Sequence, residues 1–312
     1  MTIHAGGVVR ERDLGGYAVK PTLIVCNVEF SPEGRAVLTM ALRLARWYEA
    51  ELHVAHLGSR VRSQNKSVTA RAVDHELSAR LDNFVAGANA EGIKVDTVIL
   101  QGDAVSALVD YTRSVSGELI LVSQHGRRGS PYWLAGTLGK EVGRRAGCPT
   151  LTVPDRSASQ AGADAPFKNI VCGIDFSESS ALALGHALVV AQQTHARLTL
   201  LHVLERVPNE VHNLRMKLKA LVPAEALNAC DVDIDIESGI PRDAIPTTAA
   251  ARGADLIVIG QPRTTSHRVV MASTAGAVQR RARCPVLTVP EAAISEDMAS
   301  RSTDRTMNAT RA

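Results

Sequence analysis

Short, continuous apolar runs alternate along the chain with longer segments that carry apolar residues at helical spacing. Residues 22–28 and 118–123 are such runs, and their length suits buried strands. The segment from 32 to 48 places its apolar side chains on one helical face: Val37, Met40, Ala41, Leu44, Ala45 and Tyr48. Continuous apolar strands separated by helices are typical of a parallel sheet covered on both faces.

The pattern predicts five strands and four helices in the first half. The strands are expected at residues 22–28, 52–57, 94–100, 118–123 and 150–153. The first helix follows the capping residue Ser31, and the others are expected at 67–91, 104–115 and 137–146. The second half repeats this order with a shorter second helix at 208–228. We therefore predict an α/β fold of two tandem, doubly wound parallel five-stranded sheets, Rossmann-like, each with strand order 3-2-1-4-5.

Five segments of the first half return in the same order in the second half. LIVCNVEFSPEG returns as NIVCGIDFSESS, ELHVAH as RLTLLH, VILQGDAVSAL as IESGIPRDAI, ELILVSQH as DLIVIGQP, and CPTLTVP as CPVLTVP. The offset is 146 between Cys26 and Cys172 but 136 between Cys148 and Cys284. The second copy therefore loses nine residues after its second strand and one in the loop after its fourth, and the chain contains one domain twice.

The repeats set the expected domain boundaries. Residues 21–154 form the first domain and 167–290 the second, joined by a small-residue linker at 155–166. Residues 1–20 are expected to be an N-terminal tail. Residues 291–312 are polar without apolar periodicity, so we expect a disordered C-terminal tail.

Composition excludes several classes of partner. The formal charge of +3 is near balance, and aromatics at 3% do not interleave with a basic patch, so no nucleic-acid partner is expected. No apolar run reaches the roughly 18 residues that a spanning helix needs, so no membrane partner is expected. The first twenty residues do not have the pattern of a signal peptide.

The five cysteines point to a reducing compartment. Cys26 and Cys172 occupy matching apolar strands, where a thiol serves as a small buried hydrophobe. Disulfides or metal ligation are the alternative, but no close Cys or His spacing supports them, and we expect no metal site. We therefore expect a cytoplasmic protein.

A glycine-rich loop after the fourth strand carries the candidate chemistry. It runs from Ser123 through His125, Gly126, Arg127, Arg128 and Gly129 to Gly136 and Thr137. The loop leaves the sheet where the strand order reverses and opens the fourth helix, whose free N–H groups attract phosphate. Glycine permits close approach of a ligand. The alternative is a turn-rich loop with solvated arginines.

At this loop the sequence resembles the universal stress protein family. The family signature G-x2-G-x9-G-[S/T] binds ATP phosphates and ribose, and here it reads Ser123-x2-Gly126-x9-Gly136-Thr137. The resemblance extends over residues 20–154 and 167–290, and includes the IVxxxDFS start and the CPVLxVP end. It implies the fold strongly and ATP less so, since the family has members that bind nucleotide and members that do not.

The resemblance assigns further nucleotide contacts. An aspartate at the end of strand one approaches the adenosine, and its counterpart here is Glu29 in the first unit; a solvated strand-end carboxylate is the alternative. Asn27, Val28 and Leu57 would line the adenine. Apart from the resemblance, His125, Arg127 and Arg128 add positive or donor groups near the phosphate loop. His56 and His202 are expected to be strand-end histidines with local hydrogen bonds.

The second unit departs from the signature. Asp175 takes the position of the adenosine-binding aspartate, and the adenine-lining positions hold Gly173, Ile174 and Val203. Gly260 keeps the first glycine, but the remaining signature positions hold Arg263, Ala272 and Ser273, and the loop is one residue shorter. The sequence therefore predicts a degenerate second site, with about one ATP per chain bound with Mg²⁺ in the first unit.

Three functions remain open at this stage. The first is a non-catalytic stress-response regulator that binds ATP or a related adenine nucleotide. The second is a nucleotide-free scaffold that acts through protein partners whose identity is unknown. The third is a weak ATPase. The matching final strands at 150–153 and 286–289 are further expected to pair as an intramolecular pseudo-dimer, with a homodimer as an additional possibility.

Overall fold

The structure is a computed structural model that describes residues 20–58, 69–89, 92–125, 137–155, 165–204, 211–262 and 273–291. In the first unit the strands are β1 (Leu23–Asn27), β2 (Glu51–Leu57), β3 (Val95–Leu100), β4 (Leu119–Ser123) and β5 (Thr150–Val153). The helices are α1 (Pro32–Tyr48), α2 (Thr69–Asn89), α3 (Ala104–Ser114) and α4 (Thr137–Ala146).

The second unit repeats this order. Its strands are β6 (Asn169–Gly173), β7 (Arg197–Leu204), β8 (Val232–Ser238), β9 (Leu256–Gln261) and β10 (Val286–Pro290). Its helices are α5 (Glu178–Thr194), α6 (Val211–Ala220), α7 (Ala224–Ala229), α8 (Pro241–Ala251) and α10 (Thr274–Arg281). The single helix expected at 208–228 is wrong, because the chain forms two helices there. Pro223 precedes α7 with φ −56° and ψ 144°, a conformation that a continuous helix excludes.

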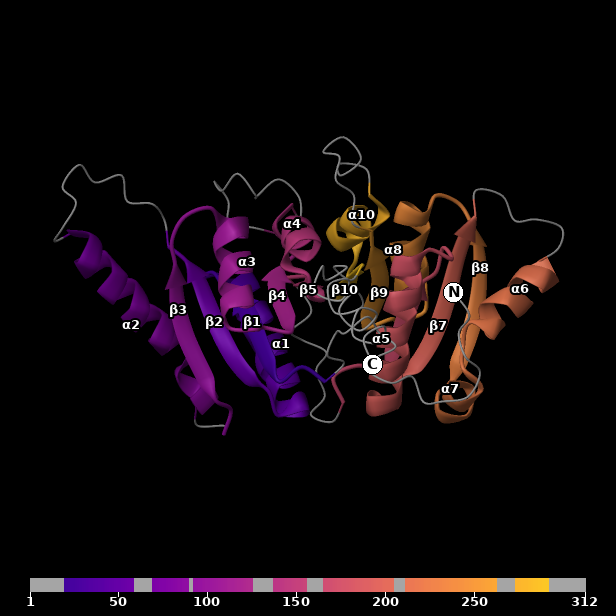
Figure 1. The fold of residues 1–312 in the computed structure, drawn as a ribbon, viewed down its shortest axis with the longest axis horizontal. Helices are drawn as coiled ribbons and strands as arrows, with labels where there is room; N and C mark the ends of the chain where they lie inside the picture. The colour runs from indigo at the N-terminus through magenta and orange to yellow at the C-terminus, as the bar shows by residue number, and fades with distance from the viewer. Residues whose placement is uncertain are drawn as a thin grey trace, which may run out of the picture.

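The ten strands form one sheet in the order β3-β2-β1-β4-β5-β10-β9-β6-β7-β8 (Figure 1). Each half has the predicted order 3-2-1-4-5 and is parallel throughout. The halves join where β5 and β10 pair antiparallel, with Leu151 opposite Leu287 and Thr150 opposite Thr288. The predicted pairing of the two final strands is therefore present, and it converts two five-stranded sheets into one continuous sheet with no open edge at the centre.

Helices cover both faces of the sheet. On one face a single hydrophobic core runs under α1, α2, α5, α6 and α7, so it continues across the junction between the units. On the other face α3 with α4, and α8 with α10, cover two separate cores. Cys26 and Cys172 are fully buried in the continuous core, as expected for small hydrophobic side chains. Within the parts of the chain that the structure describes, no helix has both the length and the apolar character needed to cross a membrane.

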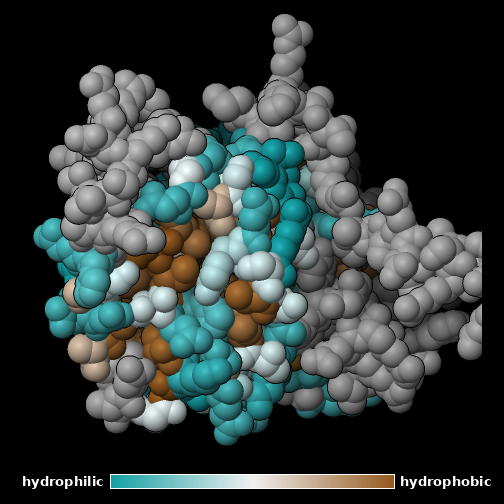
Figure 2. All heavy atoms as spheres, turned by 60° about the vertical axis from the view of Figure 1, so that its left-hand side comes forward, coloured by the Kyte–Doolittle hydropathy of each residue, from teal (hydrophilic) through white to brown (hydrophobic). Residues whose placement is uncertain are grey.

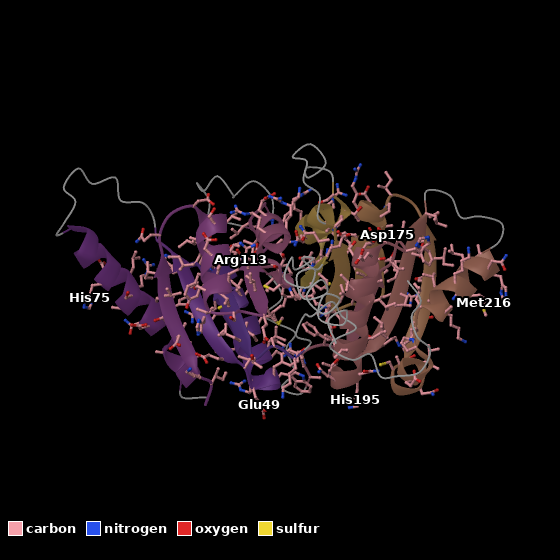
Figure 3. All side chains as sticks on the ribbon, in the orientation of Figure 1. Glu49, His75, Arg113, Asp175, His195 and Met216 are labelled. Carbon is pink, nitrogen blue, oxygen red and sulfur yellow. The ribbon has the colours of Figure 1, made fainter. Side chains whose placement is uncertain are left out.

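The first helices of the two units begin and end alike. Ser31 and Ser177 are their N-caps, and each hydroxyl accepts a hydrogen bond from the backbone N–H three residues later. Glu49 and His195 end the helices at φ 57° and 52°, the left-handed conformation that closes the last turn. Figure 3 shows Glu49 and His195 at the lower edge of the sheet and Asp175 toward the upper edge, where the parallel strands end.

The β8 edge of the sheet carries charge. In β8 apolar residues alternate with Asp233, Asp235 and Glu237, and Arg252, at the C-terminus of α8, bridges Asp233 at 2.9 Å and Asp235 at 2.6 Å. Figure 2 brings the β3 side of the molecule forward and shows hydrophobic residues in separate patches between hydrophilic ones. The charge along β8 discourages pairing of this edge with another sheet.

Candidate functional site

A cavity of about 240 Å³ opens at the carboxyl ends of the strands in the second unit. β6 ends at Gly173, which lies between Leu201 of β7 and Ile259 of β9 in the sheet register. This is the point where the chain order reverses, because β6 pairs with the second strand of its unit on one side and the fourth on the other. A single water needs about 10–15 Å³ of such space, so the cavity has room for an organic ligand.

The cavity has an apolar wall and a polar end. The apolar wall comes from the strand ends and α8: Gly173, Ile174, Leu201, Val203, Ile245 and Ile259. The polar end comes from the starts of α5 and α10 and the end of β9: Asp175, Ser179, Ser180, Gln261, Ser273 and Thr274. An apolar wall with convergent polar groups is the usual composition of a small-molecule site.

The absence of a side chain at Gly173 keeps the cavity open. A Cβ at this position would point toward Ile245 and Ile259, into the apolar wall, at an ordinary contact distance of 3.4 Å from the Ile245 Cδ1. The equivalent residue in the first unit is Asn27, which is only 2% exposed. The Oδ1 atom of Asn27 has no hydrogen-bond partner among the residues that the structure describes. The two units therefore differ at the same position: one leaves space, and the other buries an acceptor.

Asp175 is fixed in its charged form beside the polar end. Its Oδ1 accepts hydrogen bonds from the backbone N–H of Ser177, at 3.0 Å, and from the Ser177 hydroxyl. Burial works to raise the pKa of Asp175, but the hydrogen bonds from Ser177 outweigh it and hold the pKa below its ordinary value. The carboxylate is thus an available acceptor near neutral pH.

The start of α10 supplies donors to the same end. Ser273 caps the helix and its hydroxyl accepts from the Gly276 N–H at 3.3 Å. Gly260 of β9 brings the first turn of α5 close, because a Cβ there would lie 2.4 Å from the Ser179 carbonyl carbon and oxygen. Unpaired N–H groups and the helix dipole make such a helix start favourable for an anion.

Two further lining residues come from the first unit. Lys140 and Arg144 of α4 line the cavity of the second unit, and α4 lies beside α10 above the β5–β10 junction (Figure 1). The sequence analysis missed both. Their spacing of four residues places them on one face of α4, but no local pattern shows that this face meets the other unit.

Comparison with known proteins identifies the family. The family model described as "Universal stress protein family" matches residues 22–154 and again 166–290. The chain belongs to the universal stress protein family.

The relatives agree with this assignment. A Staphylococcus haemolyticus protein assigned to the universal stress proteins is 28% identical over 147 residues, which cover 42% of this chain and 89% of that protein. A universal stress protein structure from Archaeoglobus fulgidus has a TM-score of 0.69 at 19% identity, covering 88% of this chain and 97% of that one. A related Pseudomonas aeruginosa structure has a TM-score of 0.59 at 18% identity, covering 89% and 94%. At these identities the two structures support the fold.

In the first unit, the described residues include only the two ends of the loop expected from the family signature. Asn27, Val28 and Leu57 lie at the strand ends as predicted, Glu29 follows at partial exposure, and Ser123 ends β4 with its hydroxyl donating to the His125 carbonyl at 2.7 Å. Thr137 begins α4. The remaining predicted residues lie outside the described ranges: Gly126, Arg127, Arg128, Gly129 and Gly136, with Arg263 and Ala272 in the second unit.

The strand-end histidines are structural, as expected. His56 Nδ1 lies 2.8 Å from the Val28 carbonyl oxygen, and His202 Nδ1 lies 2.6 Å from that of Ile174. In both units the imidazole fixes the backbone just before the acidic residue of the site. This bond positions Glu29 and Asp175 at the end of their strands.

A cluster on β2 and β3 has the composition of a metal site. The ligand atoms of Glu51, His53 and Asp96 lie within 4.8 Å of one another. His53 lies 3.1 Å from Glu51 and 3.5 Å from Asp96, Lys94 pairs with Glu51 at 2.7 Å, and the Tyr111 hydroxyl lies 2.8 Å from His53 Nδ1. These contacts form an ion-pair network at the surface.

Proposed function

We propose that this tandem universal stress protein is a regulatory protein that binds an adenine nucleotide, with the cavity of the second unit as its principal site. The observation that carries the proposal is the cavity itself, which joins an apolar wall at Gly173 to the start of α10 at Ser273. An adenine ring needs an apolar surface, and its phosphates need a cluster of donors. The cavity supplies both at the switch point of the sheet.

Each part of the nucleotide has a chemical counterpart in the lining. The base would pack on Gly173, Leu201 and Ile245, where no side chain projects from β6. The ribose hydroxyls would donate to the Asp175 carboxylate, which its hydrogen bonds keep ionised. The phosphates would lie at the start of α10, and a Mg²⁺ ion bound with them would take most of its ligands from phosphate and water.

The first unit remains part of the proposal. Its loop through Gly126, Arg127, Gly136 and Thr137 fits the family signature better, and the buried Asn27 Oδ1 accepts no hydrogen bond from the described part of the chain. A ligand N–H would satisfy that acceptor, which otherwise carries the cost of burial without a hydrogen bond. We nevertheless prefer the second unit, because Asn27 occupies the space that Gly173 leaves open.

We further propose that the role is binding rather than catalysis. The hydroxyl that donates to Asp175 belongs to Ser177, which is also the N-cap of α5 and accepts from the Ser180 N–H. That hydroxyl already makes hydrogen bonds that hold the start of α5. This arrangement supports a regulator that changes its protein partners when it binds a nucleotide. The scaffold and the weak ATPase remain as alternatives for the experiment to distinguish.

The test is a calorimetric titration of the full chain with ATP in the presence of Mg²⁺. Gly173→Val would fill the apolar wall while its Cβ makes an ordinary contact, so the variant should fold and lose binding in the second unit. Gly136→Val should act in the same way on the first unit. We expect about one ATP per chain, lost in Gly173→Val and kept in Gly136→Val.

The other outcomes separate the alternatives. Two sites per chain, each lost in one variant, would show that both units bind. A single site that only Gly136→Val removes would overturn our choice of unit. Absence of binding to the parent chain would support the nucleotide-free scaffold, and steady phosphate release that Gly173→Val abolishes would support the ATPase.

A further inference from the structure

A buried hydrogen bond connects the two units at the end of β9. Gln261 ends β9 and lines the cavity of the second unit, and its Nε2 donates to the backbone oxygen of Lys140 at 3.1 Å. This bond fixes the backbone of α4 beside the cavity. The position of Lys140 is therefore set by the second unit as well as by its own helix.

The Lys140 side chain lies over the first turn of α10. A Cβ built at Gly276 would be 2.9 Å from Lys140 Cδ, 3.3 Å from its Cε and 3.2 Å from the Ser273 hydroxyl oxygen. Lys140 is 5% exposed and lines the cavity. Among the described residues, no carboxylate lies within ion-pair distance of its ammonium group.

Positive charge is concentrated at this point. Burial is the main cause that lowers the pKa of Lys140; Glu141 works in the opposite direction, and Arg280 and Arg144 lower the pKa further. Glu141 is already paired with Arg144 at 2.8 Å. The Arg144 Nε is buried and has no hydrogen-bond partner within the described ranges of the chain. Because Glu141 is already paired, an anion would stabilise the positive charges of Lys140 and Arg144.

The lysine of this arrangement has no counterpart in α10. Lys140 and Gly276 are equivalent positions, since the offset between the units is 136 from Cys148 to Cys284. Gly276 leaves room for the lysine, but it has no side chain to extend over α4 in return. The second unit thus receives a lysine from its neighbour, and the first unit receives none.

We propose that the anion end of the second-unit cavity is a composite site, in which Lys140 and Arg144 of the first unit bind the phosphates of the ligand together with the start of α10. This inference rests on the proposed function for the identity of the ligand as a nucleotide. Beyond the proposed function, the composite site identifies the first unit as the source of the cationic side chains. It predicts that the site prefers polyphosphate ligands to the nucleoside. It also implies that a bound phosphate links α4 to α10 across the junction.

The test compares Lys140→Met with the parent chain, using ATP, AMP, adenosine and inorganic tripolyphosphate as separate probes in calorimetry. Methionine keeps an apolar stem over Gly276 and removes the charge. We expect ATP and tripolyphosphate affinities to fall tenfold or more, as for loss of a charged hydrogen bond. Adenosine affinity should change by less than twofold, and Lys140→Arg should restore part of the ATP affinity.

Lys94→Met is the matched control, because it removes one positive charge at the opposite sheet edge, where Lys94 pairs with Glu51. It should leave ATP binding as in the parent.

If Lys140→Met binds ATP and tripolyphosphate like the parent, the composite site is wrong while nucleotide binding stands. If the parent binds tripolyphosphate but neither ATP nor adenosine, the nucleotide proposal fails and the anion site stands. If the parent binds none of the four probes, both are overturned.

Discussion

Gln124 and Gln261 occupy equivalent positions at the end of the fourth strand of each unit, and each side chain crosses the junction to the other unit. Gln124 Nε2 donates to the carbonyls of Gln279 in α10 and of Ala282 at its C-terminus, at 2.6 and 3.0 Å, and Gln261 donates to the carbonyl of Lys140 in α4. Both glutamines are buried. The β5–β10 pairing is thus reinforced by a reciprocal polar contact on the face that carries the cavity.

Replacing Gln124 with leucine should destabilise the chain more than the same change at Gln261. Gln124→Leu leaves two buried carbonyls without their donor, which costs about 1–3 kcal/mol in the free energy of unfolding. Gln261→Leu loses one hydrogen bond and also removes an Oε1 atom that has no partner among the described residues, so its cost should be smaller. Urea unfolding of both variants measures the order, and a larger effect at Gln261 would contradict it.

Adding a methyl group at Gly276 should weaken ATP binding without weakening the fold. Alanine favours the helix by about 0.5–1 kcal/mol over glycine, but its Cβ would displace the Lys140 stem, now 2.9 Å away. We expect Gly276→Ala to unfold at an equal or higher urea concentration and to bind ATP several-fold more weakly.

The same substitution in a Lys140→Met background provides the control. With the charge already absent, Gly276→Ala should have a smaller effect on ATP affinity than in the parent chain. Equal effects in the two backgrounds would show that Gly276 acts on the site without Lys140.

Gly260→Ala should be strongly destabilising. Its Cβ would lie 2.4 Å from the Ser179 carbonyl and 2.7 Å from the Ser180 nitrogen, which are backbone atoms and cannot rotate away. α5 would have to move off β9, at a cost of about 3 kcal/mol. Gly173→Ala, at the end of the neighbouring strand, meets only ordinary contacts and should cost less than about 1 kcal/mol. Thermal unfolding that ranks the two variants in the reverse order would refute this packing argument.

Acid should destabilise the junction through His186. This residue of α5 is 3% exposed in a cavity between the units that Tyr48 and Glu118 also line. Burial lowers the pKa of His186 to about 4, below the value of about 6.5 in an unfolded chain. The unfolded chain therefore takes up the proton first as the pH falls. The contribution is fully present above about pH 6.5, and about 3 kcal/mol of stability is lost as the pH approaches 4.

His186→Leu should reduce that loss. Urea unfolding at several pH values between 7 and 4 gives the slope, and the difference between variant and parent isolates His186 from the carboxylates that titrate in the same range. His212→Gln, at an exposed position of α6, is the control and should keep the parent slope. An unchanged slope in His186→Leu would show that the acid sensitivity lies elsewhere.

Much of this protein follows from local sequence pattern. The alternation of apolar runs and helical segments predicted a parallel sheet with helices on both faces, because a continuous apolar strand must be covered on both sides. The strand order of each unit is the predicted 3-2-1-4-5. The repeat of CPTLTVP as CPVLTVP placed equivalent edge strands at the ends of both units, and β5 and β10 do pair. Pro223 was present in the sequence, yet the break between α6 and α7 was missed because apolar residues continue at helical spacing on both sides of it, from Leu218 to Leu227.

The sequence predicted the candidate site only in part. The family resemblance assigned Gly173, Asp175, Gly260 and Ser273 to the second unit, and all four line the cavity. The same comparison predicted a degenerate second site, because Arg263 and Ala272 replace glycines of the signature and the loop is one residue shorter. Only the tertiary structure places Lys140 in the cavity of the other unit. Antiparallel pairing of β5 with β10 brings α4 beside α10. Residue spacing within α4 does not indicate which of its faces will contact the second unit, because that depends on the pairing of two strands far apart in the sequence.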